Sequence, residues 1–398
     1  MPADNFFKYL LLKTRRFCGF ICGFLFFLSG ILKLMDPVGA GLVMAEYMDF
    51  LHLKFLAFAS KPLGVAFALA ETIIGTALIT GVWRKTTGIA ALAFQGFFTF
   101  LTLLLVIFNP EMDCGCFGEA IHLTHMETFL KNIVLCLLLC AYFFPVKLLG
   151  TPLKHKYVPF AVVTASIFAF TVYSWMYIPL VDFTDYKPGA LLKAAENSTE
   201  ADGEMYEAVF IYEKDGKEEA FELEHLPDST WNFVRTATEK IADYDTEGLI
   251  DLSFYNEEGE YMDSLATDGR VMVVSVYDTD ISDRRWKEIS EFIHNAEEAG
   301  FKTLLLVSDS FETSVEIPDA YIADYKTLLA MNRSNGGVTY FSDGYLIRKW
   351  AFKARPDMET LSEIQNEDET ETVIYHNTKG SLAFQGFLLY VFAVMLLL

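Results

Sequence analysis

The sequence predicts an α-helical membrane bundle followed by an external α/β domain. Two observations lead to this prediction. Hydrophobic residues make up 53% of the 398 residues, which is high for a soluble protein. Charge is also unevenly distributed, because residues 1–180 carry 13 Lys and Arg against 9 Asp and Glu, whereas residues 181–398 carry 18 against 44. The two parts of the chain therefore suit different solvents.

Six apolar stretches approach the length of about 20 residues that spans a bilayer. We expect five spans in the first region and one at the end of the chain: 17–35, 63–83, 87–108, 128–149, 157–180 and 382–398. No small-residue cleavage site follows the first stretch, so we interpret it as a retained signal anchor. Lipid is thus an expected environment for the chain.

Basic residues in short loops predict the orientation of the spans, because cytoplasmic loops are enriched in Lys and Arg. Such residues precede the first span, separate the second from the third, and separate the fourth from the fifth: Lys8, Lys13, Arg15, Arg16, Arg84, Lys85, Lys147, Lys154 and Lys156. We therefore expect an integral protein of the bacterial inner membrane. Its N-terminus would be cytoplasmic and its acidic domain periplasmic.

The external region begins with a linker and a small β unit. Two short runs of strand-forming residues, 208–212 and 220–223, flank Asp215-Gly216, a pair that favours a tight hairpin turn. From residue 251 the pattern alternates between strand and helix. We expect strands at 271–277 and 303–307, helices at 283–299 and 326–333, and a hairpin of 338–341 with 345–350.

This order of elements resembles a thioredoxin-like domain. The resemblance departs at the functional positions, since Asp278 to Asp283 stands where a Cys-x-x-Cys pair would begin the helix, and Asn335-Gly336-Gly337 stands where a cis-proline is expected. We therefore expect the domain to bind or present a partner rather than to perform thiol chemistry. Its acidic surface also excludes nucleic acid as a partner.

Cys114 and Cys116 are the residues that most strongly indicate chemistry. They lie in a polar gap between two apolar stretches, in the run Asp113-Cys114-Gly115-Cys116-Phe117-Gly118-Glu119. A Cys-x-Cys disulfide closes a small strained ring, and strain favours a transferable bond. The neighbouring carboxylates should raise the thiol pKa and a helix starting near His122 should lower it, so the net direction stays open.

Other interpretations of the two cysteines are a permanent disulfide, inert thiols, or a metal site with His122 or His125. Cys-x-Cys with one histidine lacks the usual fourth ligand, so we expect no metal.

Glu71 and Lys33 are charged residues within apolar stretches. A charge at mid-membrane costs about 2.5–3.5 kcal/mol on insertion scales, so Glu71 is expected to be protonated, paired or facing a cavity. It is a candidate for proton handling or for contact with a quinone, and the alternative is a neutral packing residue. Lys33 can either reach Glu71 or extend to the membrane surface.

Together these motifs resemble the DoxX-like membrane family, in particular its methylamine utilisation (MauE) branch. The resemblance rests on Ser29-Gly30-Ile31-Leu32-Lys33, Asp36-Pro37, Glu71 with Gly75, and Cys114-Gly115-Cys116-Phe117-Gly118. It implies a four-helix membrane core that supports disulfide formation or the maturation of an envelope enzyme, together with a thioredoxin-like or other envelope redox protein. It also implies Cys114, Cys116 and Glu71 as catalytic candidates, and Lys33 with Glu71 as quinone contacts.

We therefore expect a redox-associated membrane protein linked to thiol-disulfide exchange or quinone. The alternative is a non-catalytic scaffold whose acidic external domain binds a protein partner. The expected organisation is a DoxX-like membrane domain, a fifth helix, a linker with a small β unit, a thioredoxin-like domain, an acidic linker and a final membrane helix: residues 1–150, 151–182, 183–250, 251–356, 357–380 and 381–398.

Overall fold

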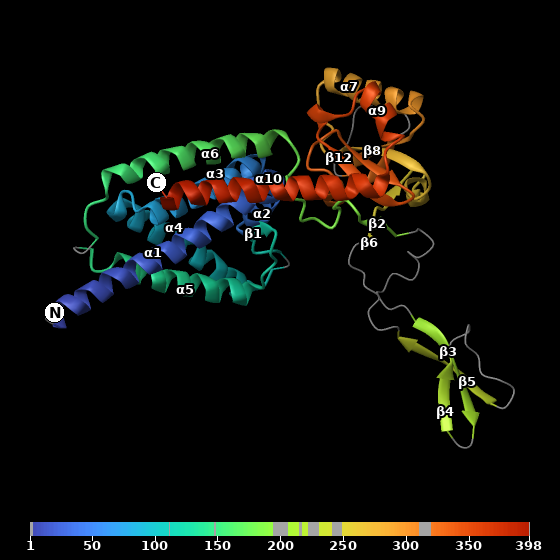
Figure 1. The fold of residues 1–398 in the computed structure, drawn as a ribbon. Helices are drawn as coiled ribbons and strands as arrows, with labels where there is room; N and C mark the ends of the chain where they lie inside the picture. Colours follow the sequence, from blue (N-terminus) through green and yellow to red (C-terminus); the bar gives the residue numbers. More distant parts are fainter. Residues whose placement is uncertain are drawn as a thin grey trace.

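The computed structural model describes residues 3–110, 112–146, 149–193, 206–214, 217–221, 231–240, 249–309 and 320–397. A bundle of long helices adjoins an α/β domain, and a separate three-stranded sheet lies apart from both (Figure 1). The first residues of α1 and the last residues of α10 lie at the end of the bundle that is distant from the α/β domain (Figure 1).

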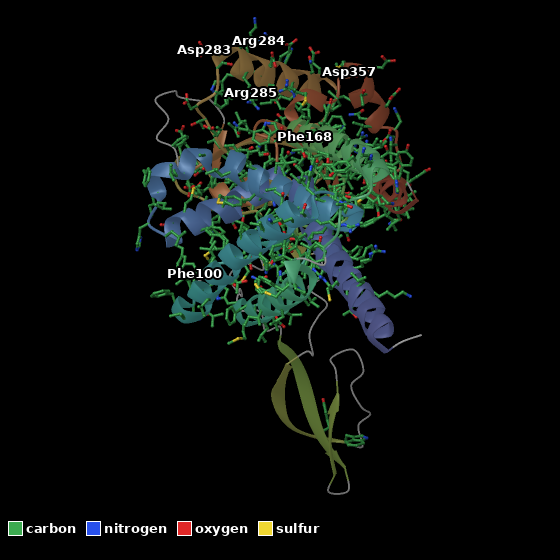
Figure 2. All side chains as sticks on the ribbon, turned by 90° about the vertical axis from the view of Figure 1, so that its left-hand side faces the viewer. Phe100, Phe168, Asp283, Arg284, Arg285 and Asp357 are labelled. Atoms are coloured by element: carbon green, nitrogen blue, oxygen red, sulfur yellow. The ribbon has the colours of Figure 1, made fainter. Side chains whose placement is uncertain are left out.

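Six helices of the described chain are long and apolar enough to cross a membrane. They are α1 Ala3–Met35, α3 Ser60–Thr80, α4 Arg84–Phe108, α5 His125–Phe143, α6 Tyr157–Met176 and α10 Glu369–Leu397. Large apolar side chains such as Phe100 and Phe168 are exposed on them, whereas charged Asp283, Arg284 and Asp357 lie on the α/β domain (Figure 2). The protein is therefore an integral membrane protein, as the six apolar stretches predicted.

Glycines allow α1 and α3 to cross at close range. A Cβ added to Gly75 would lie 2.5 Å from the backbone nitrogen of Phe27, and one added to Gly30 would lie 2.2 Å from the hydroxyl of Thr72. Small residues let membrane helices approach until their backbones touch. This contact sets the height at which the side chains of α1 meet those of α3.

A short helix that the sequence analysis missed, α2 Pro37–Phe50, follows α1 directly. Asp36 accepts hydrogen bonds from the backbone N–H groups of Val38 and Gly39, and Pro37 occupies the first helical position, a typical helix start. Asp36-Pro37 directly follows the first predicted span, 17–35, and we predicted no helix directly after it. The helix ends at Leu51 and leads through η1 Lys54–Ala59 into α3.

The α/β domain is built on an eight-stranded sheet with the order β6-β2-β12-β11-β8-β9-β10-β7. The predicted strands and helices of residues 271–350 occur in the predicted order. They are β8 Arg270–Val276, α7 Asp283–Glu298, β9 Lys302–Ser308, α8 Tyr325–Met331, β11 Gly337–Ser342 and β12 Tyr345–Trp350. Strands β8 and β9 are parallel, while β11 is antiparallel to both β8 and β12.

Alternate residues of β8 enter two cores on opposite faces of the sheet. Val271 and Val273 pack with α8, whereas Met272, Val274 and Val276 pack with α7, as the side-chain alternation of a strand requires. The sheet also contains two strands that we did not predict, β7 Phe254–Tyr255 and β10 Ala320–Ala323. Two single helical turns, η6 Asp263–Ala266 and η7 Phe352–Ala354, lie outside the sheet.

The region expected to be a linker with a small β unit, 183–250, contributes to both sheets. Its ends form β2 Leu191–Leu192 and β6 Leu249–Ile250, which pair with each other at one edge of the large sheet. Its middle forms β3 Tyr206–Lys214 and β4 Lys217–Phe221, the expected hairpin, with an additional strand β5 Asn232–Lys240. The predicted turn residues Asp215 and Gly216 lie outside the described residues.

Residues 357–380, expected to be an acidic linker, are mostly helical. Helix α9 Met358–Ile364 packs Leu361 and Ile364 into the core beside α7. Helix α10 then begins at Glu369 and continues as one element to Leu397. Acidic residues in the first turn of a helix stabilise its N-terminus. The run of acidic residues that we expected in a linker therefore includes the start of a helix. The remaining single turn, η3 Lys154–Lys156, precedes α6.

Replacing Gly75 by alanine should destabilise the bundle, because the new methyl group meets the backbone of α1 and cannot be accommodated by a side-chain rotation. We expect a loss of about 1–3 kcal/mol, seen as a lower midpoint of thermal unfolding in detergent. The control is Gly96→Ala on α4, where nothing lies within 4 Å of the added Cβ. Equal midpoints for the two variants would contradict the close crossing of α1 and α3.

Candidate functional site

The cysteine loop, residues 113–119, joins α4 to α5 at the end of the bundle that faces the α/β domain. Two hydroxyl groups hold its backbone from beneath. Tyr47 of α2 donates a hydrogen bond to the carbonyl oxygen of Cys114 at 3.1 Å, and Ser29 of α1 donates one to the carbonyl oxygen of Cys116 at 2.5 Å. Cys116 then begins the short strand β1 Cys116–Glu119. These two hydrogen bonds fix the backbone of both cysteines against α1 and α2.

Gly115 is required between the cysteines for two reasons. Its φ of +59° lies in the left-handed region, where glycine has no steric cost. A Cβ at this position would also lie 2.2 Å from the nearer methyl carbon of Val43 on α2. The loop can therefore pack closely on α2 only with glycine at this position.

The two thiols differ in accessibility. All six cysteines are free and lie within the described residues; Cys114 is buried and Cys116 is partly exposed. Burial raises the pKa of the Cys114 thiol; Cys116 and Asp113 add to this increase, whereas Thr128 and Lys131 oppose it. The direction that the sequence left open is thus upward for Cys114. The more exposed Cys116 is better placed to meet a protein in solution.

An apolar cavity of about 240 Å³ lies beneath the cysteine loop. Side chains of α2, α3 and α4 line it together with Cys114, Gly115 and Cys116, and among the described residues Lys33 is the one charged side chain of the lining. Phe97 also lines the cavity and is 47% exposed on the outer surface of α4, so the cavity reaches toward the lipid-facing side. Such a lining suits an apolar ligand with few polar groups.

Lys33 and Glu71 form an ion pair inside the bundle. The Lys33 ammonium lies 2.6 Å from the Glu71 carboxylate, and the two side chains are 16% and 11% exposed. The sequence left open whether Lys33 would reach Glu71 or extend to the surface, and the structure shows that it reaches Glu71. The close crossing of α1 and α3 brings the two residues together. Lys33 therefore connects Glu71 to the cavity that the cysteines line.

Arg333 of the α/β domain binds two carboxylates of the membrane part. Its guanidinium donates to Asp36 at 2.9 Å and to Glu119 at 3.1 Å. Asp36 is the N-cap of α2, and Glu119 ends the cysteine loop. We call these three residues the Arg333 cluster.

The Arg333 side chain is only 6% exposed. Burial alone would lower the pKa of Arg333, but the carboxylates of Asp36, Glu119 and Asp182 together raise it. The guanidinium therefore stays charged while it holds the loop.

Two further ion pairs connect the α/β domain to the membrane part. Lys349 of β12 lies 2.6 Å from Asp182, which follows α6, and Lys326 of α8 lies 3.4 Å from Glu46 of α2. Lys349 is 5% exposed, whereas Lys326 is 75% exposed. Exposed ion pairs contribute little, so the Lys349 and Arg333 contacts are the ones that position the domain.

The histidines and the remaining cysteines lie in other surroundings. His125 uses both ring nitrogens, one against Asn109 and one against the carbonyl of Met112. Cys18 and Cys22 pack among apolar residues at the end of the bundle distant from the domain. There Arg15 donates hydrogen bonds to carbonyl groups in the last turn of α5 and to one just after the helix. Within the described chain, no group of three His, Cys, Asp or Glu residues could hold a metal ion.

The structure places Cys114, Cys116 and Lys33 on one cavity and Glu71 against Lys33. Sequence reasoning selected these four residues, and their catalytic and cofactor roles stay predictions. It missed Tyr47 and Arg333. Tyr47 lay in a stretch that we had not assigned to any element. Arg333 is separated from Glu119 by 214 residues, and no local pattern connects the two.

Comparison with known proteins identifies part of the chain. Residues 9–145 match the family described as methylamine utilisation protein MauE, and residues 206–242 match a domain of unknown function, DUF8463. The first match supports a MauE-like membrane protein. No curated protein and no solved structure matches the chain. The DoxX-like and thioredoxin-like resemblances remain predictions.

Replacing Arg333 by methionine should loosen the cysteine loop, because it leaves Asp36 and Glu119 without their cation. Removing one partner of a buried ion pair typically costs about 3–5 kcal/mol. We expect faster amide hydrogen exchange in residues 36–39 and 113–119. Arg284→Met is the matched control, since Arg284 is exposed and, in the part of the chain that the structure describes, pairs with Glu288 alone, one turn away. Unchanged exchange in the Arg333 variant would show that the cluster does not hold the loop.

Proposed function

We propose that this protein is a membrane thiol-disulfide oxidoreductase that serves an envelope enzyme or its maturation. The observation that carries the proposal is the position of Cys114 and Cys116 at the wall of an apolar cavity that also holds Lys33, the partner of Glu71. Cys116 takes the outward role because it is partly exposed, and Cys114 takes the resolving role because it is buried. The match to a methylamine utilisation family supports an envelope role.

The exchange with a partner protein moves a disulfide without any other reactant. A thiolate of the partner attacks the sulfur of Cys116 in the Cys114–Cys116 disulfide, and Cys114 leaves as a thiolate. A second partner thiolate then attacks its own sulfur in the mixed disulfide and releases Cys116. The partner gains a disulfide, and the two cysteines of this protein take up the electron pair and two protons. Gly115 gives the loop the positive-φ backbone conformation that the structure shows between the two cysteines.

The cavity fits the head group of a quinone, the cofactor class suggested by the resemblance. Its lining is apolar apart from Lys33 and the Tyr47 hydroxyl, and its volume is below the roughly 300–1,000 Å³ of pockets for larger ligands. A quinone held there would accept the two electrons and two protons that are released when the thiols form a disulfide. Lys33 would bind its polar oxygen, and Glu71, which lies 2.6 Å from Lys33, would take part in the proton transfer.

The α/β domain has a supporting role in this proposal. It lacks cysteines, so it contributes no electrons of its own and holds the loop through the Arg333 cluster. A thioredoxin-like partner from the envelope would approach the cysteine loop beside it. By the distribution of basic residues, the loop and the domain would face the periplasm of a bacterial inner membrane.

The alternative, a non-catalytic scaffold, shares this arrangement but uses the cysteines as a fixed staple. The buried contacts of Arg333 and Lys349 favour a firmly held external domain, which a scaffold also needs. The two functions differ in whether the disulfide can be transferred.

Single cysteine variants separate the two roles that we assign. Cys114→Ser should accumulate a mixed disulfide between Cys116 and its partner: in the reverse of the exchange above, the Cys116 thiolate attacks the partner's disulfide and releases one partner thiolate, and no Cys114 thiolate is present to release the partner. Cys116→Ser should accumulate none. The measurement is non-reducing electrophoresis of the full-length protein after acid trapping in cells. The exposed Cys140 on α5 provides the control, since Cys140→Ser should behave like the wild type. Equal trapping in the Cys114 and Cys116 variants would sink the assignment.

Glu71→Gln should impair electron transfer to quinone but not thiol exchange. The amide has nearly the size of the carboxylate and still accepts a hydrogen bond from Lys33, but it cannot take up a proton. We expect thiol-driven reduction of a short-chain quinone to fall roughly 100-fold, while mixed-disulfide trapping stays at its wild-type level.

Asp49→Asn is the control for that variant, because Asp49 also pairs with a lysine but is 60% exposed. An unchanged quinone rate in the Glu71 variant would remove Glu71 from the mechanism.

A further inference from the structure

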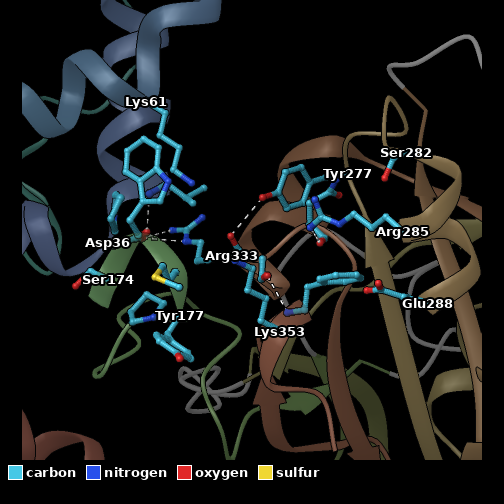
Figure 3. A pocket seen from close by; sticks show the side chains of 18 of the residues that line it. Asp36, Lys61, Ser174, Tyr177, Tyr277, Ser282, Arg285, Glu288, Arg333 and Lys353 are labelled. Carbon is cyan, nitrogen blue, oxygen red and sulfur yellow. Dashed lines mark hydrogen bonds and ion pairs between the residues drawn. The ribbon is translucent and has the colours of Figure 1, made fainter. Parts of the chain in front are cut away.

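A second cavity, of about 530 Å³, lies between the membrane part and the α/β domain. One side is formed by the ends of the membrane helices, with Lys61 at the start of α3 and Trp175 and Tyr177 at the end of α6. The other side is formed by the start of α7 and the loop before β11, with Arg285 and Tyr277 (Figure 3). We call it the basic pocket. It is separate from the apolar cavity beneath the cysteine loop.

The basic pocket carries more positive charge than its carboxylates neutralise. Five cations line it, Lys61, Arg284, Arg285, Arg333 and Lys353, against two carboxylates, Asp36 and Glu288. Asp36 is bound by Arg333, and Glu288 lies 2.9 Å from Arg284. Within the described chain, no carboxylate lies within ion-pair distance of Lys61, Arg285 or Lys353. Most of these cations belong to residues 181–398, a region in which acidic residues outnumber basic ones by 44 to 18. The excess of positive charge in the pocket is therefore opposite to the charge of the region as a whole.

Arg285 is prepared to bind an anion. It lies over the ring of Phe352, 4.3 Å from the centroid, and one of its terminal nitrogens donates to the carbonyl of Asn335. Its Nε is buried and has no hydrogen-bond partner in the described structure. A buried donor without a partner costs roughly 1–3 kcal/mol. Arg285 also lines the pocket, so an anion bound there would give its guanidinium a charged partner.

The start of α7 adds a second anion-binding element to the same pocket. Ser282 is the N-cap, but its side chain makes no capping hydrogen bond, so the first N–H groups of this 16-residue helix lack that partner. Free N–H groups and the helix dipole favour a phosphate or carboxylate at this end. Ser282, Arg284 and Arg285 all line the pocket.

The pocket lies at the expected boundary between lipid and water. Lys61 extends over the ring of Trp175 at 4.7 Å, and Trp175 and Tyr177 are 45% and 41% exposed at the end of a spanning helix. Tryptophan and tyrosine are enriched at membrane interfaces, and lysine and arginine side chains close to the membrane surface attract anionic lipid head groups. The pocket is therefore within reach of phosphates on the membrane surface.

We propose that the basic pocket binds a phosphate group, held by Lys61, Arg285, Lys353 and the N-terminus of α7. The source is either the phosphodiester of an anionic phospholipid or a soluble phosphate, since both present the same oxygen atoms to these donors. Because Lys61 comes from the membrane part and Arg285 and Lys353 from the domain, the bound phosphate joins the two. The pocket shares Asp36 and Arg333 with the Arg333 cluster but shares no lining residue with the apolar cavity beneath the cysteine loop.

The test uses the full-length protein in detergent, with the midpoint of thermal unfolding as the measurement. One arm adds phosphatidylglycerol against phosphatidylcholine, and the other adds inorganic phosphate against chloride at equal ionic strength. The variant is Lys61→Gln with Lys353→Gln, and each single change is tested as well. Lys353 is exposed and has no hydrogen bond or ion pair with another described residue, so its single variant should fold.

The control variant, Lys54→Gln with Lys287→Gln, removes the same charge from the same two parts of the protein but outside the pocket. We expect phosphatidylglycerol, inorganic phosphate or both to raise the midpoint of the wild type and the control by several degrees. The pocket variant should need at least fivefold more ligand for the same shift. A response to lipid alone assigns the lipid source, and a response to inorganic phosphate alone assigns the soluble one. Equal responses of the pocket and control variants, or no response in either arm, overturn the proposal.

Discussion

The arrangement of this protein depends on one buried guanidinium. Arg333 reaches from the α/β domain to Asp36, which begins α2, and to Glu119, which ends the cysteine loop. Burying an arginine is costly unless its charge is matched, and here two carboxylates from segments far apart in the chain match it. The two carboxylates depend on Arg333 as well, because without its positive charge they would repel each other at the membrane surface. The same contact of Arg333 therefore fixes the position of the α/β domain and the position of the cysteine loop.

A second constraint acts inside the bundle and meets the first at the cysteines. The close approach of α1 and α3 at Gly30 and Gly75 brings Lys33 within 2.6 Å of Glu71. Ser29 is on the same helix and holds the carbonyl of Cys116. Helix α1 thus carries, within five residues, a contact to the thiol loop and a contact to the buried carboxylate. The thiol loop and the buried carboxylate therefore lie beside the same apolar cavity, as the proposed coupling of electron and proton transfer requires.

What the sequence could predict follows from how local each signal is. Apolar length identifies a membrane span without reference to partners, and alternation of strand and helix identified β8, α7 and β9 for the same reason. Helix α2 was missed because Asp36-Pro37, its start signal, directly follows the end of α1. The two-residue strand β2 has no pattern of its own and exists only through its pairing partners. Cys114, Cys116, Lys33 and Glu71 were recognised because each is unusual in its own segment. Arg333 is ordinary in its segment, and its importance comes entirely from residues 214 and 297 positions away.

The reduction potential of the Cys114–Cys116 couple in the full-length protein, measured by equilibration with glutathione in lipid nanodiscs, tests the central claim most directly. The claim is that these cysteines carry a transferable disulfide. We expect a potential between about −120 and −230 mV, the range of proteins that transfer or isomerise disulfides. A potential below about −300 mV is typical of structural disulfides and would contradict the claim, leaving the protein as a membrane scaffold.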